Sequence, residues 1–310
     1  MGHHSSNRQP SWFMRLLFAP LGLVLLLMAM MPFSVLYPIA SFIGFMAYRI
    51  VRYRRRIVHI NILESFPEMS ASERARIERK FYRHLADYFV ETVKFSHMSE
   101  KSLRKHMQFA DTFNIDNAIA EGRDIVIYTS HFGNWEWITS MGLWCESSSE
   151  ACFSHVYRPL RQPWFDRWFL RLRSRFNVSI PMKEVFRRLL TWRREDKRWV
   201  TGFLSDQKPS HAGKIFTVPF LGRETPFIGG TEELACKLDA VVMYFDTEVM
   251  GRGRYRSTIR VISRNPRAEY PGRITQRYAE SLETQIRRCP QAYLWSHNRW
   301  RIPKASSSHK

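Results

Sequence analysis

The feature that most constrains this chain is a stretch of 33 residues, 16–48, that contains no charged side chain. As one helix it would reach about 50 Å, which exceeds the roughly 30 Å hydrocarbon core of a bilayer but is too short for two full crossings. Pro32 and Pro38 interrupt it, and proline bends a helix because it lacks the amide hydrogen. We therefore expect a bent or re-entrant membrane anchor, or one span followed by an interfacial helix, rather than a cleaved signal peptide.

A cluster of cations follows the apolar stretch. Five arginines occur within residues 49–56, and each can attract an anionic leaflet by about 1 kcal/mol. Positive charge beside a membrane segment favours the cytoplasmic side. The pattern predicts an anchor and basic segment over residues 1–53, a cytoplasm-facing folded domain over residues 54–303, and a disordered tail over residues 304–310.

The overall charge restricts the kind of partner. The 310 residues include 48 Lys and Arg against 28 Asp and Glu, a net charge of +20, which favours nucleic acid, anionic lipid or a phosphorylated substrate. We find no nucleic-acid-binding motif, so a nucleic-acid partner is not expected. The four cysteines form no C-x-x-C pair and H-E-x-x-H is absent, so neither a metal site nor a disulfide framework is predicted.

Strand-like and helical segments alternate after residue 70. Ser70 and Glu73 have the spacing of a capping box, and apolar residues recur every four positions from Ile77 to Val93, which predicts a helix on a core. Such alternation is typical of an α/β sheet flanked by helices. The predicted strands are 124–130, 151–157, 199–204, 240–247 and 257–262.

The most informative block is the buried strand that ends in His131, with Gly133 and Glu136 after it. Residues five apart in one helix point roughly 140° from each other, so this histidine and glutamate cannot share a helical face. They can meet if His131 lies in the turn after the strand, Gly133 bends the backbone, and Glu136 begins the next helix. Glu136 would then hold one ring nitrogen of His131, and the other could take a proton from a hydroxyl.

One other interpretation of this block remains open, and a serine nucleophile is not favoured. His131 could cap the helix while Glu136 is a surface acid near its N-terminus. Ser130 is not a convincing nucleophile, because no G-x-S-x-G elbow surrounds it.

Several further blocks occur in an order that resembles a known family. They are the anchor with its arginine cluster, Asn61-x-x-x-Ser65-Phe66-Pro67, His131 to Glu136, Tyr157-Arg158-Pro159, Asp206-Gln207, Pro219-Phe220, and the terminal Tyr293-Leu294-Trp295-Ser296-His297-Asn298-Arg299-Trp300. Together they resemble the lysophospholipid acyltransferase superfamily with its H-x-x-x-x-D/E motif. Within it, the resemblance is to the lipid A late acyltransferases, also called lauroyl/myristoyl transferases.

The resemblance implies a mixed central sheet flanked by helices, and an inner-membrane enzyme that transfers a fatty acyl chain directly to a hydroxyl of a lipid A precursor. The donor is acyl carrier protein or acyl-CoA, and no other cofactor is implied. His131 is the expected general base and Glu136 the group that orients it. Arg158 is expected to bind a phosphate or the oxyanion, and Asp206 and Gln207 to line the site, unless they only form a turn before Pro209.

The acceptor stays open at this point, because a lysophospholipid, glycerol phosphate or an aminolipid would suit the same chemistry. Residues 155–198 contain 13 Lys and Arg against four acids, a basic stretch that can recruit anionic acyl carrier protein or lipid phosphates. Within it Arg167, Arg171 and Arg175 recur at helical spacing, which indicates a solvent-facing flank or a membrane contact.

Overall fold

The computed structural model describes residues 12–209 and 213–300. The predicted tail over residues 304–310 lies outside them. The described helices are α1 (Trp12–Met30), α2 (Phe33–Arg49), α3 (Arg55–Ser65), α4 (Ala71–Phe95), α5 (Glu100–His106), α6 (Phe113–Ala120), α7 (Pro163–Arg173), α8 (Val185–Arg194), α9 (Gly230–Leu238) and α10 (Arg273–Arg288).

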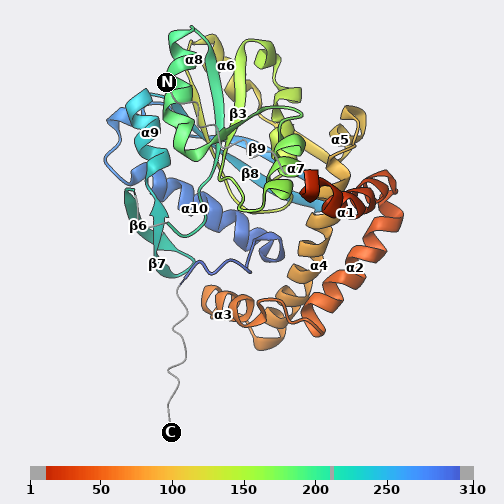
Figure 1. The fold of residues 1–310 in the computed structure, drawn as a ribbon. Coiled ribbons are helices and arrows are strands. Elements are labelled where there is room, and N and C mark those ends of the chain that lie inside the picture. The colour runs from red at the N-terminus through yellow and green to blue at the C-terminus, as the bar shows by residue number, and fades with distance from the viewer. Residues whose placement is uncertain (1–11, 210–212, 301–310) are drawn as a thin grey trace.

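A seven-stranded sheet forms the centre of the molecule (Figure 1), in the order β1-β9-β8-β2-β5-β3-β4. Its strands are β1 (Met107–Ala110), β2 (Ile125–Thr129), β3 (Ala151–Tyr157), β4 (Val178–Pro181), β5 (Arg198–Leu204), β8 (Val241–Gly251) and β9 (Arg254–Ser263). Only β8 and β9 pair antiparallel, and the other neighbours are parallel. The expected α/β class with a mixed sheet flanked by helices is therefore confirmed.

All five predicted strands are present, and four strands were not predicted. β1 and β4 have four residues each and lie at the two edges of the sheet, too short to show an alternating pattern. β6 (Ile215–Phe220) and β7 (Arg223–Ile228) form a separate antiparallel hairpin.

The central strand β2 is buried along its whole length, as expected of a parallel strand covered on both faces. Val126 and Tyr128 pack into one apolar core with residues of α8, α9 and α10. Ile125 and Ile127 pack into a second core on the other face, with residues of α6 and the 3₁₀ helix η1 (Trp137–Trp144). β2 is therefore the middle strand of the sheet and is covered on both faces.

α4 begins with the predicted capping box, in which Ser70 and Glu73 satisfy each other's backbone amides. Ile77, Phe81 and Val93 are buried as expected, but Phe89 is 59% exposed. Steps of four residues drift by about 40° around a helix, which turns Phe89 out of the core. Val93 is buried again because the end of α4 is covered on several sides, with Val90, Glu91 and Thr92 buried as well.

The uncharged stretch forms two helices, α1 and α2, separated at Met31–Pro32. The predicted bend is therefore present. Among the described residues, α1 is the one helix long and apolar enough to cross a membrane. The Nζ of Lys94 on α4 donates to the carbonyls of Ala29 and Met31, both at 2.8 Å, and so satisfies free carbonyls at the end of α1.

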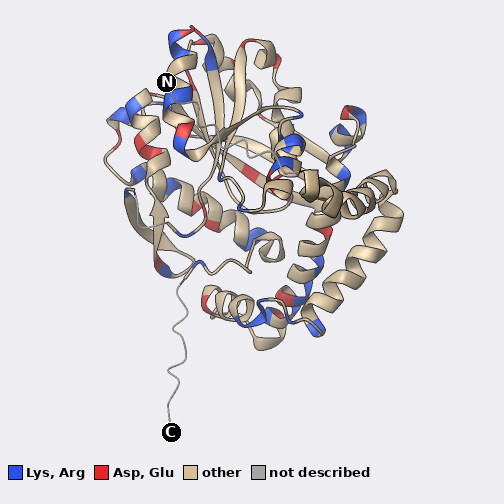
Figure 2. Cartoon of the chain, in the orientation of Figure 1, with Lys and Arg blue, Asp and Glu red and all other residues tan. Residues whose placement is uncertain are grey.

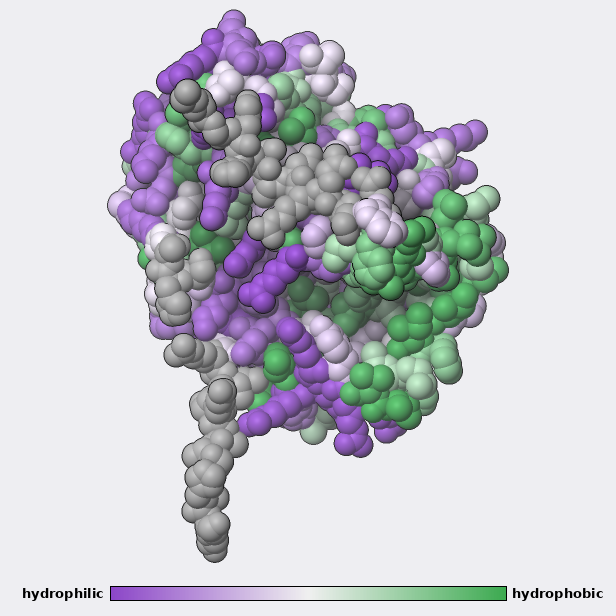
Figure 3. Space-filling model, in the orientation of Figure 1, coloured by the Kyte–Doolittle hydropathy of each residue, from purple (hydrophilic) through white to green (hydrophobic). Residues whose placement is uncertain are grey.

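α2 packs along α4 with one face and exposes the other (Figure 1). The exposed apolar side chains of α2 are Val35, Ile39, Phe42, Ile43 and Phe45. α1 and α2 are nearly free of charged residues (Figure 2), and Figure 3 shows hydrophobic surface gathered on their side of the molecule. Any relation of this surface to a membrane stays a prediction.

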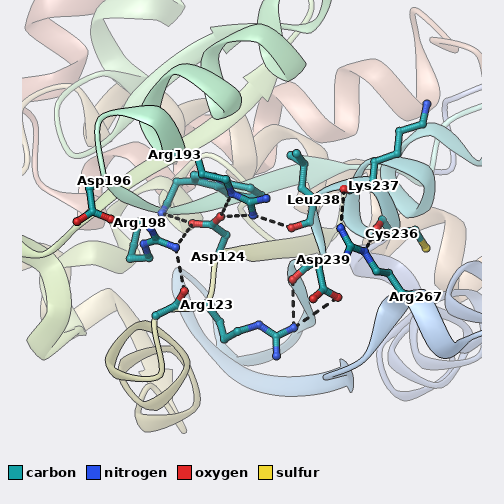
Figure 4. A network of polar contacts seen from close by, with 12 residues as sticks. Arg123, Asp124, Arg193, Asp196, Arg198, Cys236, Lys237, Leu238, Asp239 and Arg267 are labelled. Atoms are coloured by element: carbon teal, nitrogen blue, oxygen red, sulfur yellow. Dashed lines mark hydrogen bonds and ion pairs between the residues drawn. The ribbon is translucent and has the colours of Figure 1, made fainter.

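At the amino end of β2, a buried carboxylate organises a polar network (Figure 4). Both Oδ atoms of Asp124 are used: Arg193 donates its Nε to Oδ2 at 2.9 Å, and the amide of Trp199 donates to Oδ1 at 3.3 Å. Arg193 also donates to the carbonyl of Leu238 at 2.6 Å. The network joins α8, β5 and the end of α9 to the start of β2.

Candidate active site

The candidate site lies at the carboxyl ends of two neighbouring parallel strands, where α/β sheets commonly bind ligands. β2 and β5 pair in register so that their last residues, Thr129 and Leu204, are partners. His131 follows β2 by two residues and Asp206 follows β5 by two. The sheet therefore brings together two side chains that are 75 positions apart in the sequence.

Asp206 holds the imidazole of His131. Its Oδ1 lies 2.7 Å from Nδ1 of His131, and its Oδ2 accepts the backbone amide of the same residue at 3.1 Å. The Asp206 side chain is 2% exposed and that of His131 is 14% exposed. Burial opposes ionisation of Asp206, but the charge and hydrogen bonds of His131 outweigh it and lower the pKa of the carboxyl below its usual value.

The second ring nitrogen of His131 faces Gln207, whose Nε2 lies 3.1 Å away. Because an ionised carboxylate can only accept a hydrogen bond, Nδ1 carries the proton in the pair with Asp206. Nε2 then has the free lone pair and accepts from the Gln207 amide. Asp206 and Gln207, which the resemblance placed in the site, both contact His131 directly.

The expectation that Glu136 holds a ring nitrogen of His131 is wrong. Glu136 is buried and binds Arg173 of α7 in a two-point ion pair, with Nε to Oε2 and Nη2 to Oε1 both at 2.7 Å. The hydroxyl of Tyr88 also donates to it at 3.3 Å. Burial opposes ionisation of Glu136, but Arg173 outweighs it and lowers the pKa of the carboxyl.

The backbone explains why the two motif side chains do not meet. Phe132 forms an antiparallel bridge with Tyr293, and the amide of Leu294 donates to the carbonyl of His131 at 3.1 Å. This contact keeps the chain extended just after His131. Gly133 then turns it with a φ of +63°, a conformation that favours glycine, and Glu136 enters the space between α4 and α7.

A stack of aromatic rings connects the Glu136 pair with His131. The ring centroid of Trp135 lies 5.1 Å from that of His131, in an edge-to-face arrangement. It lies 3.9 Å from that of Tyr88, in a stacked arrangement. Tyr88 in turn contacts Glu136. The ion pair of Glu136 and Arg173 therefore supports the wall beside His131 and does not touch its ring nitrogens.

Arg158 lies at the same edge of the sheet, directly after β3, which pairs with β5. Its side chain is exposed, and its guanidinium makes no hydrogen bond or ion pair with another described residue. It is therefore available to an anionic ligand.

The segment that ends the described chain also lies at the site. Asn61 on α3 donates to the carbonyls of Trp295 and His297, at 2.8 and 3.0 Å. The amide of Lys208, beside Gln207, donates to the ring of His297 at 3.2 Å. Asn61, the terminal block and Asp206-Gln207, three of the blocks that carry the sequence resemblance, therefore lie together beside His131.

Two features of the site were not predicted. Arg173 was missed because the arginines of α7 look alike in the sequence, and no signal singled it out. Arg299 is 2% exposed, donates to the carbonyl of Pro226 at 2.6 Å, and stacks its guanidinium 4.6 Å above Phe227. Within the described residues, no group of three His, Cys, Asp or Glu side chains could hold a metal ion.

A comparison with family models places this chain in a known family. The model described as bacterial lipid A biosynthesis acyltransferase matches residues 8–302. The chain belongs to this family and is an O-acyltransferase.

Among curated proteins the chain is similar to two enzymes of Escherichia coli K12. It is 26% identical over 290 residues to the lipid A biosynthesis palmitoleoyltransferase, with 92% of this chain and 91% of the relative covered. It is 23% identical over 285 residues to the lipid A biosynthesis lauroyltransferase, with 90% and 89% covered. A lipid A biosynthesis acyltransferase of Haemophilus influenzae is 21% identical over 272 residues, with 87% and 83% covered.

Proposed function

We propose that this protein transfers a fatty acyl chain from a thioester donor to a hydroxyl of a lipid A precursor. The family and the printed names of the relatives support the acceptor class. The observation that carries the chemistry is the pair of His131 and Asp206, which leaves Nε2 of a partly exposed imidazole with a free lone pair.

In this mechanism His131 is the catalytic residue. The acceptor hydroxyl replaces the Gln207 amide as the hydrogen-bond partner of Nε2. Nε2 then takes the proton of this hydroxyl while the hydroxyl oxygen attacks the thioester carbonyl. The tetrahedral intermediate then breaks its C–S bond, and the imidazolium returns the proton to the departing sulfur. Asp206 is a positioning residue that keeps the required tautomer and stabilises the imidazolium.

Glu136 and Arg173 act on the reaction through structure. Their ion pair contacts Tyr88 through Glu136. Tyr88 stacks on Trp135, whose ring lies beside His131. We assign them a positioning role for the loop that carries the base. Arg158 is exposed at the same edge of the sheet, and its guanidinium suits a phosphate of the acceptor or donor, or the developing oxyanion.

The donor is acyl carrier protein or acyl-CoA. Both are anionic, and the basic stretch after the site supports their recruitment. Its exposed arginines are Arg158, Arg161, Arg171, Arg175, Arg187, Arg188 and Arg194. Attraction between exposed charges weakens with salt, so the donor's KM should rise as ionic strength increases while kcat changes little.

We place the enzyme at the inner membrane with its catalytic domain in the cytoplasm. The length and hydropathy of α1 support an anchor, and the exposed apolar face of α2 supports a helix that lies in the interface. The arginines that follow α2 support the cytoplasmic orientation.

The decisive experiment is mass spectrometry of lipid A and total lipid from cells with the gene, without it, and without it but complemented by His131→Ala. We expect the deletion to remove one acyl chain from lipid A, and only the wild-type gene to restore it. Unchanged lipid A with an altered phospholipid or aminolipid would overturn the acceptor and retain the chemistry. Restoration by His131→Ala would overturn the role of the base.

A further inference from the structure

One face of α4 carries a row of polar side chains turned toward the loop that follows His131. His84, Tyr88 and Glu91 are spaced by four and three residues, so they share a helical face. The ring of His84 packs edge-on against that of Tyr255 on β9, with ring centroids 6.4 Å apart. Tyr88 binds Glu136 and stacks on Trp135.

Glu91 is the most deeply placed member of this row, with 0% exposure. Its Oε2 accepts from Nδ2 of Asn134 at 3.0 Å and from the hydroxyl of Tyr255 at 2.9 Å, and its Oε1 accepts from the hydroxyl of Tyr37 at 3.3 Å. Its backbone carbonyl accepts from Nε1 of Trp137 at 3.3 Å. One carboxylate therefore joins the loop, β9 and α2.

A buried carboxyl group is costly, so this position would favour an apolar residue if it only filled space. Burial raises the pKa of Glu91 to about 7. The reaction of His131 needs no proton or contact from Glu91. The hydrogen bonds to three separate elements are what the carboxylate supplies and a leucine could not.

A second set of contacts fastens α2 to the same place. Arg252, in the turn between β8 and β9, donates its Nη2 to the carbonyl of Tyr37 and to Oγ of Ser41, both at 2.9 Å, and its Nε to Asp87 on α4 at 2.9 Å. The neighbouring Gly253 has a φ of +65°, and a Cβ there would fall 1.7 Å from the hydroxyl of Tyr37. The hydroxyl of Tyr37 therefore packs directly against Gly253, where no larger residue would fit.

We propose that Glu91 is a positioning residue that holds the loop of residues 132–137 and ties it to α2. The order of residues 132–137, beside His131, then depends on how α2 packs against the rest of the protein. α2 is the helix whose other face is apolar and exposed. This inference deepens the proposed function, because it assumes that His131 performs the reaction.

The test compares purified full-length variants by transfer kinetics and by hydrogen exchange of the peptide that spans residues 131–137. Glu91→Leu removes every side-chain acceptor and should lower kcat by about 10–100-fold, the size typical of a misplaced reacting group, with KM within twofold. Deuterium uptake of that peptide should rise. Glu91→Gln retains an acceptor oxygen and can donate to Oδ1 of Asn134, which has no partner among the described residues, so it should recover most of kcat.

Two further variants separate positioning from packing. Ile77 lies near the start of α4, is 8% exposed, and belongs to the core that also holds Val58 and Ile62 of α3, so Ile77→Ala should lower stability without changing kcat or uptake in residues 131–137. Tyr37→Phe removes only the link between Glu91 and α2. It should raise uptake of the loop with a smaller loss of kcat, and it tests the proposal even if Glu91→Leu does not fold.

Unchanged uptake and kcat in Glu91→Leu, or in Tyr37→Phe if that variant alone folds, would overturn the proposal. A rise in uptake equal to that of Ile77→Ala would overturn it as well, because it would show loss of packing only. Hydrogen exchange is measured without substrate. The proposed function and the positioning role of Glu91 can therefore be contradicted independently of each other. Absence of lipid A acylation by the wild type, together with a loop-specific rise in Glu91→Leu, would contradict the function and uphold the positioning role.

Discussion

Two buried aspartates at opposite ends of the same pair of strands have different roles. Asp124 immediately precedes β2 and is held by Arg193 and by the amide of Trp199 (Figure 4). Asp206 follows β5 and is held by the ring and amide of His131. Both side chains are at most 2% exposed, so burial and pairing alone do not distinguish a candidate site from a structural network.

The partners make the difference. The guanidinium of Arg193 has only hydrogen-bond donors and uses another of them to bind the carbonyl of Leu238, so Arg193 serves the fold. An imidazole can act as a proton acceptor and donor in catalysis, and among the described residues Nε2 of His131 faces only the side chain of Gln207. A buried carboxylate therefore indicates chemistry when its partner is titratable and still has an atom that a ligand can reach.

The largest effect on turnover is expected for His131→Ala. Loss of the base should lower kcat by about 10⁴-fold, and the thermal unfolding temperature should fall as well, because the buried Asp206 loses its ring partner, although the variant should still fold. Steady-state transfer kinetics and thermal unfolding monitored by circular dichroism check the two parts. A turnover close to that of the wild type would remove His131 from the mechanism.

Asp206→Asn should have the next largest effect. The amide keeps the size of the carboxylate but can donate to Nδ1 and favour the wrong tautomer, so kcat should fall by about 10³-fold. Asp124→Asn is the matched control at the other end of the strands. It should leave kcat of the folded enzyme unchanged and lower the free energy of unfolding by about 3 kcal/mol, since it breaks a buried ion pair.

Urea unfolding and kinetics of the two asparagine variants test the comparison itself. Equal losses of stability with equal losses of kcat would show that the two carboxylates do not differ in role.

Glu136 belongs to the motif, yet its pairing resembles that of Asp124. Glu136→Ala should lower kcat by about 10²-fold, less than loss of the base, because the wall beside His131 loses its support. Arg173→Ala should cause a similar loss, and the double variant should be no worse than either single one, since both remove the same ion pair. Additive losses in a double-mutant cycle would instead mean that Glu136 acts on the reaction without Arg173.

Local patterns made much of the fold predictable. β2 could be found because burial on both faces demands a continuous apolar run, and the start of α4 because Ser70 and Glu73 satisfy each other within one turn. Edge strands such as β1 were missed because four residues at a sheet edge carry too little pattern.

The partner of the base could not be predicted in the same way. Glu136 is near His131 in the sequence and was the natural choice, but the turn at Gly133 directs it toward Arg173. Asp206 reaches the imidazole only because β5 is the neighbour of β2 in the sheet. Strand order depends on the packing of the whole chain. The sequence near His131 therefore could not reveal that Asp206 is its partner.

The smallest effect is expected for Arg158→Ala. Arg158 is exposed and has no partner among the described residues, so its removal should leave the fold intact. If its guanidinium binds a phosphate of a substrate, KM for that substrate should rise about tenfold, in line with the loss of one charge-assisted hydrogen bond of roughly 1.5 kcal/mol, while kcat stays within twofold.

Arg161→Ala is the matched control, because Arg161 is an exposed cation three positions along. A larger rise of KM in Arg158→Ala than in Arg161→Ala, at both low and high salt, would establish a specific contact. Equal changes that both vanish in high salt would instead assign Arg158 to the general basic field, whose effect on exposed ligands is screened.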